Sequence, residues 1–235
     1  MVGKFYGIGV GPGDPELITV KAVNILKNID VIVCPEGKKD TESIALNIAK
    51  SYLSDSVQVL KLHFPMTYSE DTLNEKWKEN AKIIADILHS GRNIAFLTLG
   101  DPSIYSTYMY LLPFLRQNDI EIETIPGITS FCASASRVNI PLASADETLC
   151  ILPLRKGLDG LDEILDSFDN IVIMKPSHAN KKLADKINER KLNDKFVMIS
   201  KCSNNEEEIS YSIDRLRDQQ VPYLSTVIIK KGGVR

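Results

Sequence analysis

The sequence predicts an α/β fold made of two α/β domains, and three observations support this. The chain has 235 residues, which suits one large domain or two small ones at roughly 150 residues per domain. Short apolar segments alternate with longer segments of helical periodicity, an order typical of a mostly parallel sheet with covering helices. Several of the short segments run directly into loops rich in Gly, Pro, Asp and Ser.

The first half alternates regularly between the two patterns. The segment 30–34 (DVIVC) is apolar on both faces, as in a buried parallel strand, and Pro35 stops it. The segment 93–99 (NIAFLTL) is the clearest buried strand. The short apolar runs predict strands at 5–10, 30–34, 57–62 and 93–99, and the helical periodicity predicts helices at 16–27, 41–53, 72–89 and 105–116.

The second half predicts a second sheet. Its strands are expected at 120–125, 148–152, 170–174, 196–200, 207–213 and 225–230, and its helices at 130–137 and 178–189. The last two strands are expected to form an antiparallel edge. No linker rich in Pro, Gly or Ser divides the chain, so we place the boundary at 118/119. The domains are then an N-terminal α/β domain, 1–118, and a C-terminal α/β domain, 119–235.

Composition excludes several classes of function. The 28 basic and 31 acidic residues give a net charge of −3, so no overall positive field attracts nucleic acid or an anionic membrane. No window reaches the ~18 apolar residues of a membrane span, and the N-terminus lacks the apolar stretch of a signal peptide. Four dispersed cysteines and three dispersed histidines form no metal-binding motif. Free thiols favour a reducing compartment, so we expect a cytoplasmic protein without a structural metal.

The loop after the first strand, GIGVGPGDP at 7–15, looks at first like a dinucleotide-binding motif. That interpretation fails, because Pro12 or Asp14 occupies the third glycine position, where helix and strand must pack closely. The second strand also ends in Cys34 and Pro35 and not in the acidic residue that binds ribose. The loop suits a ligand that needs close backbone approach and little anion binding; the alternative is a simple turn.

Two further loops follow strands and open helices. The second, 100–107, begins with Gly100 and Asp101, and the Asp101 carboxylate either contacts a ligand or caps the next helix. The third, 126–131, contains Thr129 and Ser130, which either line the same site or cap the following helix. The carboxyl ends of parallel strands are where open α/β sheets bind ligands, so both loops are candidates for one site.

These loops, in this order and spacing, resemble those of the tetrapyrrole methylase family. The family pattern is GxGPGDxxLxT, GDP and PGxTS/A, and this sequence has it at 9–19, 100–102 and 126–130. Further stretches at 64–67, 103–110 and 140–143 resemble the branch that methylates C-20 of precorrin-2 or of its cobalt complex. The uroporphyrinogen III branch differs, with a GGDP loop where Leu99 stands here and a catalytic acid near Cys34 and Pro35.

The resemblance implies a fold, a cofactor and a set of contacts. The fold would have two α/β domains with the cofactor cleft between them, in a homodimer, and the cofactor would be S-adenosyl-L-methionine. By position in the family pattern, the cofactor-binding residues would be Pro12, Leu99, Gly100, Asp101, Ile104, Tyr105, Thr129, Ser130, Met174, Ser200, Lys201, Ser225 and Thr226. For Met174 the alternative is a core residue at a strand end.

The substrate implied by the resemblance is a polycarboxylate tetrapyrrole, precorrin-2 or cobalt-precorrin-2, so basic groups should line its site. Lys38, Lys39 and Arg137 are the candidates, and surface charge in water is the alternative for each. No catalytic residue is identified; Asp101, Tyr105 and Lys175 are candidate bases by position, with water as the alternative. Methylation of another tetrapyrrole carbon, or of a protein residue as in diphthine synthesis, is the runner-up. A nicotinamide oxidoreductase or a non-enzymatic binding module is disfavoured.

Overall fold

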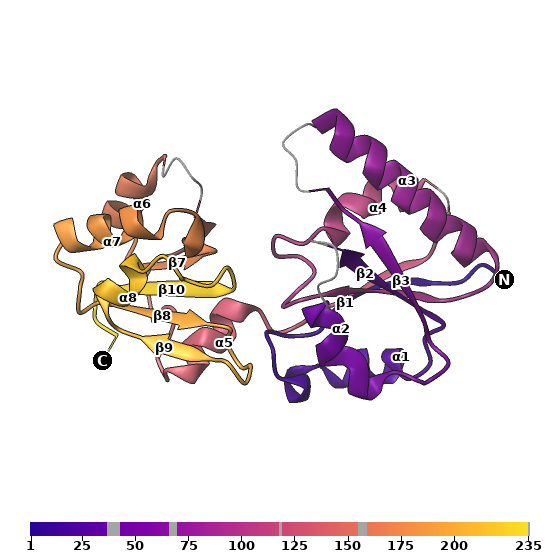
Figure 1. The fold of residues 1–235 in the computed structure, drawn as a ribbon, viewed down its shortest axis with the longest axis horizontal. Coiled ribbons are helices and arrows are strands. Elements are labelled where there is room, and N and C mark those ends of the chain that lie inside the picture. The colour runs from indigo at the N-terminus through magenta and orange to yellow at the C-terminus, as the bar shows by residue number, and fades with distance from the viewer. Residues whose placement is uncertain (37–42, 66–69, 118, 155–158, 235) are drawn as a thin grey trace. The chain divides into compact units, whose positions relative to one another are not determined.

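The computed structural model describes residues 1–36, 43–65, 70–117, 119–154 and 159–234. The chain divides into two compact units, Met1–Thr129 and Ser130–Arg235. Each unit contains one sheet and its own helices (Figure 1). The division falls later than the boundary expected at 118/119, because β5 (Ile122–Ile125) pairs in parallel with β1 (Phe5–Gly9) and completes the first sheet.

The sheet of the first unit is entirely parallel, as predicted from the alternating pattern. Its order is β3-β2-β4-β1-β5. The remaining strands are β2 (Val31–Glu36), β3 (Gln58–His63) and β4 (Ile94–Thr98). Every residue of β4 is buried, which explains its uninterrupted apolar run. The carboxyl ends of β1, β4 and β5 therefore lie at the same edge and deliver the three predicted loops there.

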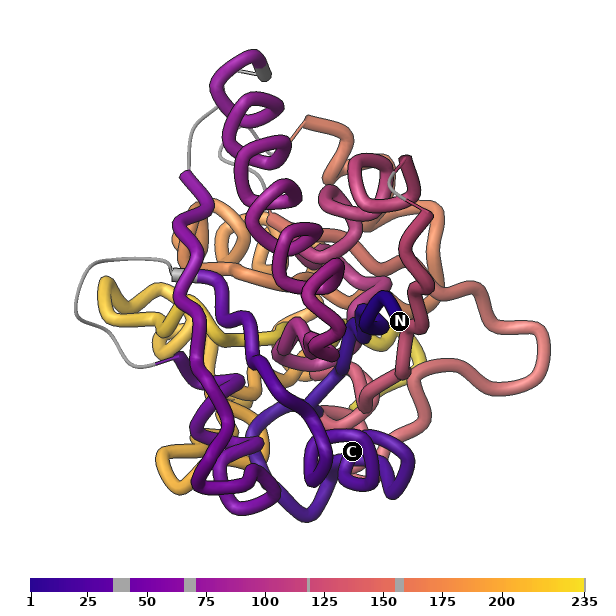
Figure 2. Tube along the Cα trace, turned by 90° about the vertical axis from the view of Figure 1, so that its right-hand side faces the viewer, coloured from indigo at the N-terminus to yellow at the C-terminus, as the bar shows by residue number. Residues whose placement is uncertain are grey.

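Helices cover both faces of this sheet (Figure 1). On one face lie α3 (Glu70–His89), the long helix in Figure 2, and α4 (Tyr108–Arg116). On the other lie α1 (Val20–Leu26) and α2 (Ile44–Ala49). The helix predicted over 16–27 is shorter, because Thr19 ends the extended loop and caps α1 by accepting a hydrogen bond from the backbone of Ala22, 3.3 Å away. Short 3₁₀ turns occupy Pro15–Leu17 and Lys50–Tyr52.

The sheet of the second unit is mixed, with the order β6-β7-β10-β8-β9. Its strands are β6 (Leu149–Pro153), β7 (Asn170–Met174), β8 (Phe196–Ser200), β9 (Glu208–Ser210) and β10 (Ser225–Lys230). The expectation that the last two strands form an edge is right for β9 and wrong for β10. β10 lies between β7 and β8, antiparallel to both, and all of its residues are buried.

Helices also pack on this second sheet (Figure 1). They are α5 (Ser130–Arg137), α6 (Leu161–Ser167), α7 (Asn180–Glu189) and α8 (Ile213–Arg217), with a 3₁₀ turn at Pro176–His178 before α7. The core under α6, α7 and α8 includes Leu165, Leu183 and Leu216. Neither α6 nor α8 was predicted, because each is too short to establish a clear helical period. No helix in the described ranges is long and apolar enough to cross a membrane.

Candidate functional site

The three predicted loops meet through their glycines in the first unit. Gly9 and Gly127 lie so close to Gly100 that side chains would collide: a Cβ on Gly127 would lie 2.2 Å from the Gly100 carbonyl oxygen, and one on Gly9 2.6 Å from it. Gly11 and Gly100 form an isolated bridge, with the Gly100 N–H donating to the Gly11 carbonyl at 2.7 Å. Only glycine permits backbones this close, so the three loops form one continuous backbone surface.

Asp101 joins the second loop to the third. Its Oδ2 accepts a hydrogen bond from the backbone N–H of Gly127 at 2.9 Å, across 26 residues of sequence. Its Oδ1 accepts from the backbone N–H and the hydroxyl of Ser103. The helix-capping alternative for Asp101 is thereby excluded, since α4 begins later and Ser106 Oγ accepts from the Tyr108 N–H instead. Because both oxygens already bind loop donors, Asp101 is a poor candidate for the base.

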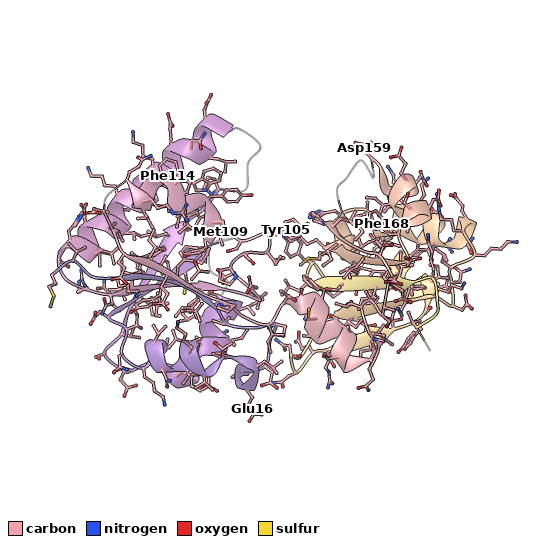
Figure 3. All side chains as sticks on the ribbon, turned by 180° about the vertical axis from the view of Figure 1, so that it is seen from behind. Glu16, Tyr105, Met109, Phe114, Asp159 and Phe168 are labelled. Atoms are coloured by element: carbon pink, nitrogen blue, oxygen red, sulfur yellow. The ribbon has the colours of Figure 1, made fainter. Side chains whose placement is uncertain are left out.

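The other cofactor candidates of the first unit lie on or beside these loops. Pro12 and Gly100 are buried, whereas Leu99 and Ile104 are partly exposed. Tyr105 is 50% exposed in the loop before α4 (Figure 3), and its φ of 49° places it in the left-handed region that favours glycine. Such strain concentrates at functional loops. Thr129 Oγ1 is buried and has no hydrogen-bond partner among the described residues, so this hydroxyl does not cap α5.

A pocket of about 490 Å³ opens at the carboxyl ends of β2 and β4 in the same unit. Its walls combine apolar surface with hydroxyl groups, and none of the described residues that line it is charged. The lining residues are Pro35, Ser43, Ile44, Ala45, Phe96, Leu97, Thr98, Leu99, Tyr105, Ser106 and Thr107. Leu99 and Tyr105 were predicted from sequence, so the pocket adjoins the predicted loops.

The sequence did not identify Thr98, Ser106 or Ser43 as site residues. Thr98 and Ser106 are buried, and their hydroxyls lie 3.1 Å apart. Ser106 directly follows Tyr105 in the sequence. Ser43 caps α2 by accepting from the Leu46 N–H at 3.4 Å. Hydroxyl residues at helix starts are common, so no local signal separates a pocket-lining serine from an ordinary cap. Burial raises the pKa of the neighbouring Cys34 thiol to about 11, which keeps that thiol protonated.

The cofactor candidates of the second unit gather around the start of β10. Met174 and Thr226 are register partners in β7 and β10, and Ser200 and Ser225 are register partners in β8 and β10. Ser200 and Ser225 are nearly fully buried, and their hydroxyls lie 2.7 Å apart. These two hydroxyls therefore hold strands together within the unit, and Met174 and Lys201 remain the more accessible members of the group.

The basic residues predicted to bind the substrate carboxylates are Lys38, Lys39 and Arg137. Lys38 and Lys39 lie outside the described residues. Arg137 lies at the end of α5, where its guanidinium forms a salt bridge of 2.7 Å with the Glu207 carboxylate. This interaction raises the pKa of Arg137, and the salt bridge occupies the side chain with a carboxylate of its own unit. A carboxylate ligand would compete with Glu207 for Arg137, which weakens the prediction that Arg137 binds substrate.

Within the described ranges, no group of three or more His, Cys, Asp or Glu side chains could hold a metal ion. The first unit does fit S-adenosylmethionine, because the glycine-lined backbone and the unpartnered Thr129 hydroxyl offer hydrogen-bonding groups without a concentration of charge. That chemistry suits a ligand with a neutral adenosine and a zwitterionic amino acid.

Comparison with known proteins agrees with this geometry. Residues 4–214 match the family model described as Tetrapyrrole (Corrin/Porphyrin) Methylases. The chain is 39% identical to a probable cobalt-precorrin-2 C(20)-methyltransferase of Methanocaldococcus jannaschii, covering 98% of this chain and 97% of that protein. It is 31% identical to the cobalt-precorrin-2 C(20)-methyltransferase of Salmonella typhimurium, covering 98% of each.

Solved structures show the same fold. A cobalt precorrin-4 methyltransferase aligns with a TM-score of 0.78 at 22% identity, over 97% of this chain and 94% of that one. The uroporphyrin-III C-methyltransferase of Thermus thermophilus, solved with S-adenosylhomocysteine, aligns with a TM-score of 0.70 at 18% identity, over 97% and 92%. The resemblance seen in the three loops is thus confirmed over nearly the whole chain. The chain belongs to the tetrapyrrole (corrin/porphyrin) methylase family.

Proposed function

We propose that this protein transfers a methyl group from S-adenosylmethionine to C-20 of precorrin-2 or cobalt-precorrin-2 in cobalamin biosynthesis. The observation that carries the proposal is the near-full-length identity, 39% and 31%, to relatives named for this reaction. The loop site supports it independently, because Gly9, Gly100 and Gly127 form the backbone surface that the cofactor requires.

The cofactor would lie against the three loops of the first unit. Backbone groups around Pro12, Gly100 and Asp101 would approach it closely, and the Thr129 hydroxyl would find there the partner that it lacks in the part of the chain that the structure describes. The remaining proposed contacts are Leu99, Ile104, Tyr105, Ser130, Met174, Ser200, Lys201, Ser225 and Thr226. Of these, Ser200 and Ser225 would act through their backbone, since their hydroxyls already bind each other.

The reaction needs alignment more than a reactive protein group. S-adenosylmethionine supplies a methyl group that its sulfonium already activates, and a meso carbon of the tetrapyrrole is electron-rich. The rigid loops would orient the two reactants and exclude water. After transfer the C-20 proton must leave. Water would accept it, because the oxygens of Asp101 are bound to Ser103 and Gly127, and the Tyr105 phenol can accept a proton only after losing its own.

The pocket beside Tyr105, whose described lining residues are uncharged, would receive the ring portion of the substrate. Its volume of about 490 Å³ and its mixed apolar and hydroxyl walls suit a neutral edge of a macrocycle. The acidic side chains of the substrate would then need basic groups elsewhere. Lys38, Lys39 and Arg137 remain proposed contacts for these carboxylates.

Methylation of another tetrapyrrole carbon is the second candidate. A relative named cobalt-precorrin-4 C(11)-methyltransferase, from Priestia megaterium, is 29% identical over 152 residues, which is 65% of this chain. The shorter match makes C-11 the weaker candidate. Methylation of a protein residue has no relative among those described above.

The test is methyl transfer to a defined carbon. The protein is incubated with S-adenosylmethionine and either precorrin-2 or cobalt-precorrin-2 under anaerobic conditions, and the product is analysed by mass spectrometry and by NMR with a ¹³C-labelled methyl group. We expect one added methyl on C-20, and comparing the two substrates shows whether cobalt is required. A methyl on another carbon would support the second candidate. Addition to neither substrate would refute the C-20 assignment.

Two further features belong to the proposal. Four free cysteines are consistent with a cytoplasmic protein, and family membership suggests a homodimer. Light scattering coupled to size-exclusion chromatography would give twice the 26.2 kDa chain mass for a dimer.

A further inference from the structure

Three lysines of the second unit have a left-handed backbone, which a residue with a side chain rarely adopts. They are Lys175, with a φ of 56°, Lys191, with a φ of 55°, and Lys201, with a φ of 49°. Glycine or asparagine normally occupies such positions, because a Cβ crowds the backbone there. A lysine in this conformation is therefore expected to have either a local structural cause or a function of its side chain.

Helix termination explains Lys191. It follows α7, and the next residue, Leu192, donates its N–H to the carbonyl of Ile187 at 3.0 Å. This hydrogen bond is the usual closure of a helix whose following residue is left-handed. Lys191 needs no further function.

Lys175 and Lys201 are different, because they follow strands. Lys175 comes directly after β7 and donates its N–H to the Ser225 carbonyl at 3.2 Å. Lys201 comes directly after β8 and donates to the Leu224 carbonyl at 2.7 Å. Since β7 and β8 flank β10 on its two sides, both lysines lie where β10 begins. This is the edge at which the proposed cofactor residues Met174 and Thr226 also lie.

The loop before β10 is fixed by buried hydroxyls. Ser225 Oγ donates to the Pro222 carbonyl at 2.8 Å and lies 2.7 Å from Ser200 Oγ. Tyr223, between Pro222 and Ser225, is 43% exposed. The backbone on both sides of Tyr223 is therefore tied to the buried Ser225 hydroxyl, while the residue itself reaches solvent.

Two basic side chains frame this ring. Lys175 Nζ lies 5.5 Å from the Tyr223 ring centroid, a cation–π contact. The His178 ring meets Tyr223 edge to face, with centroids 5.7 Å apart and planes at 80°. We call Lys175, His178 and Tyr223 the β7-edge cluster. It combines an ammonium, an imidazole and a phenol hydroxyl, all of which can donate hydrogen bonds to a carboxylate.

Several other cations of this unit pair with its own carboxylates. Lys201 pairs with Glu206, and Lys230 pairs with Glu147 at 2.7 Å. Every arginine of the unit that the structure describes is also in an ion pair: Arg137 with Glu207, Arg190 with Asp162 and Asp166, Arg215 with Glu208, and Arg217 with Asp185. The features that distinguish the β7-edge cluster are its aromatic partner and its place beside the proposed cofactor residues.

We propose that the β7-edge cluster binds carboxylate side chains of the tetrapyrrole substrate, with Lys175 as the principal contact. The inference rests on the proposed function, because it is the polycarboxylate substrate that needs such a group. The proposal explains why a lysine stands at this left-handed position. A glycine would fit the left-handed backbone better, but it would not supply the ammonium that lies over the Tyr223 ring. Lys175 is accordingly a specificity residue and not the base that removes the C-20 proton.

The test uses Lys175→Gly in the full-length protein. Glycine suits the left-handed backbone, so the melting temperature should stay the same or rise. The KM for the tetrapyrrole should rise about tenfold, as expected for loss of one charge-assisted hydrogen bond. The kcat and the dissociation constant of S-adenosylhomocysteine should change less than about twofold, which corresponds to a small fraction of that energy. Lys175→Arg, which keeps the charge, should recover most of the affinity.

Lys191→Gly is the matched control. It makes the same substitution at the same backbone conformation, at a lysine that ends a helix and lies outside the proposed site. It should raise or preserve the melting temperature and leave the KM unchanged. An equal effect of both substitutions on KM would overturn the proposal, as would an unchanged KM in Lys175→Gly.

A binding measurement separates this proposal from the proposed reaction. Quenching of the fluorescence of uroporphyrin III, a polycarboxylate porphyrin, reports binding without turnover. Weaker binding by Lys175→Gly than by the unmodified protein would support the cluster even if no methyl transfer to C-20 were observed. Equal binding by both would refute the cluster while leaving the methyl transfer intact. A larger loss for S-adenosylhomocysteine than for uroporphyrin III would assign Lys175 to the cofactor and overturn the proposal.

Discussion

Asp101 shows how one side chain can join two loops of a site. Its carboxylate binds the Gly127 N–H at 2.9 Å and two donors of Ser103, so it fixes the third loop against the second. The sequence alone left its role open between ligand contact and helix cap. The observed role, a hydrogen bond to the third loop, depends on Gly127, which is 26 residues away in the sequence and close only in the fold.

Replacing Asp101 with Ala should therefore weaken cofactor binding. The Gly127 N–H would lose its acceptor, at a cost of about 1–3 kcal/mol, and the third loop would no longer be held. We expect the dissociation constant of S-adenosylhomocysteine, measured by calorimetry, to rise by about tenfold or more. Ser103→Ala is the control, because it removes one hydroxyl donor and leaves the bond to Gly127. Wild-type affinity in Asp101→Ala would show that this bond does not shape the site.

Gly127 lets the backbone of the third loop lie directly against that of the second. A Cβ at this position would lie 2.2 Å from the Gly100 carbonyl oxygen, a distance that no packing adjustment of a side chain can relieve. Gly127→Ala should separate the two loops and abolish measurable binding of S-adenosylhomocysteine, with the far-ultraviolet circular dichroism spectrum retained. The comparison is Gly232→Ala, where the nearest atom to a new Cβ is 3.9 Å away, so binding should be unchanged. Similar binding by both variants would contradict the close approach.

At the scale of elements, the sequence predicted best the strands that are buried on both faces. β7, β8 and β10 have the predicted ends, because their apolar runs stop where burial stops. The three glycine loops were also predictable, since Gly, Pro and Asp mark a backbone that no helix or strand can supply. The unpredicted α6 and α8 have seven and five residues, too few to show a helical period.

The prediction that β10 lies at the edge of the second sheet was wrong, and the central position of β10 changes which proposed site residues are accessible. Strand order depends on how the strands pack and pair in three dimensions. The sequence of a single strand does not show which strands lie beside it. Because β10 is central, Ser200 and Ser225 are buried against each other. From sequence they were predicted to line the cofactor, by their position in the family pattern.

Glu123 links three elements and predicts a pH effect. Its carboxylate, on β5, binds Lys21 of α1 and Lys4 before β1, and these contacts lower its pKa from 4.5 to about 2. A lowered pKa means that the stabilisation is complete above the unfolded value of 4.5 and is lost as the pH falls towards 2. The free energy of unfolding should therefore decrease over that interval.

Glu123→Gln should flatten this part of the pH dependence, because the glutamine amide does not titrate. Urea unfolding at several values between pH 5 and pH 2.5 measures the effect, at low salt to limit screening. Glu121→Gln serves for comparison, since the Glu121 carboxylate pairs with one lysine, Lys4, among the described residues and its side chain is 72% exposed. Identical pH profiles for Glu123→Gln and the unmodified protein would mean that the contacts of Glu123 contribute nothing to stability.

At the scale of the whole molecule, each unit has its own core. The two clusters of the first unit lie within residues 5–125, one on each face of the parallel sheet, and the cluster of the second unit lies within residues 154–229. A core confined to one unit implies that the unit can fold by itself. The segment that decides where the first unit ends is β5, which the sequence assigned to the second domain.

Two fragments of the first unit test this boundary. The fragment 1–129 retains β5, whereas 1–118 ends before it. Without β5, the edge of β1 is exposed, the hydrogen bond from the Phe5 N–H to the Glu121 carbonyl is lost, and Ile120 and Ile125 leave the two cores. Burial of those two side chains alone contributes about 3–6 kcal/mol, a large part of the 5–15 kcal/mol that stabilises a typical domain.

We expect 1–129 to unfold cooperatively in urea and to remain monomeric, because its sheet and both cores are complete. The fragment 1–118 should be unfolded or aggregated, since an open, apolar strand edge pairs readily with another chain. Circular dichroism during urea unfolding and size-exclusion chromatography distinguish the two. If 1–118 unfolded as cooperatively and at the same urea concentration as 1–129, the boundary would lie where the sequence first placed it, and β5 would be an accessory of the first sheet and not part of its fold.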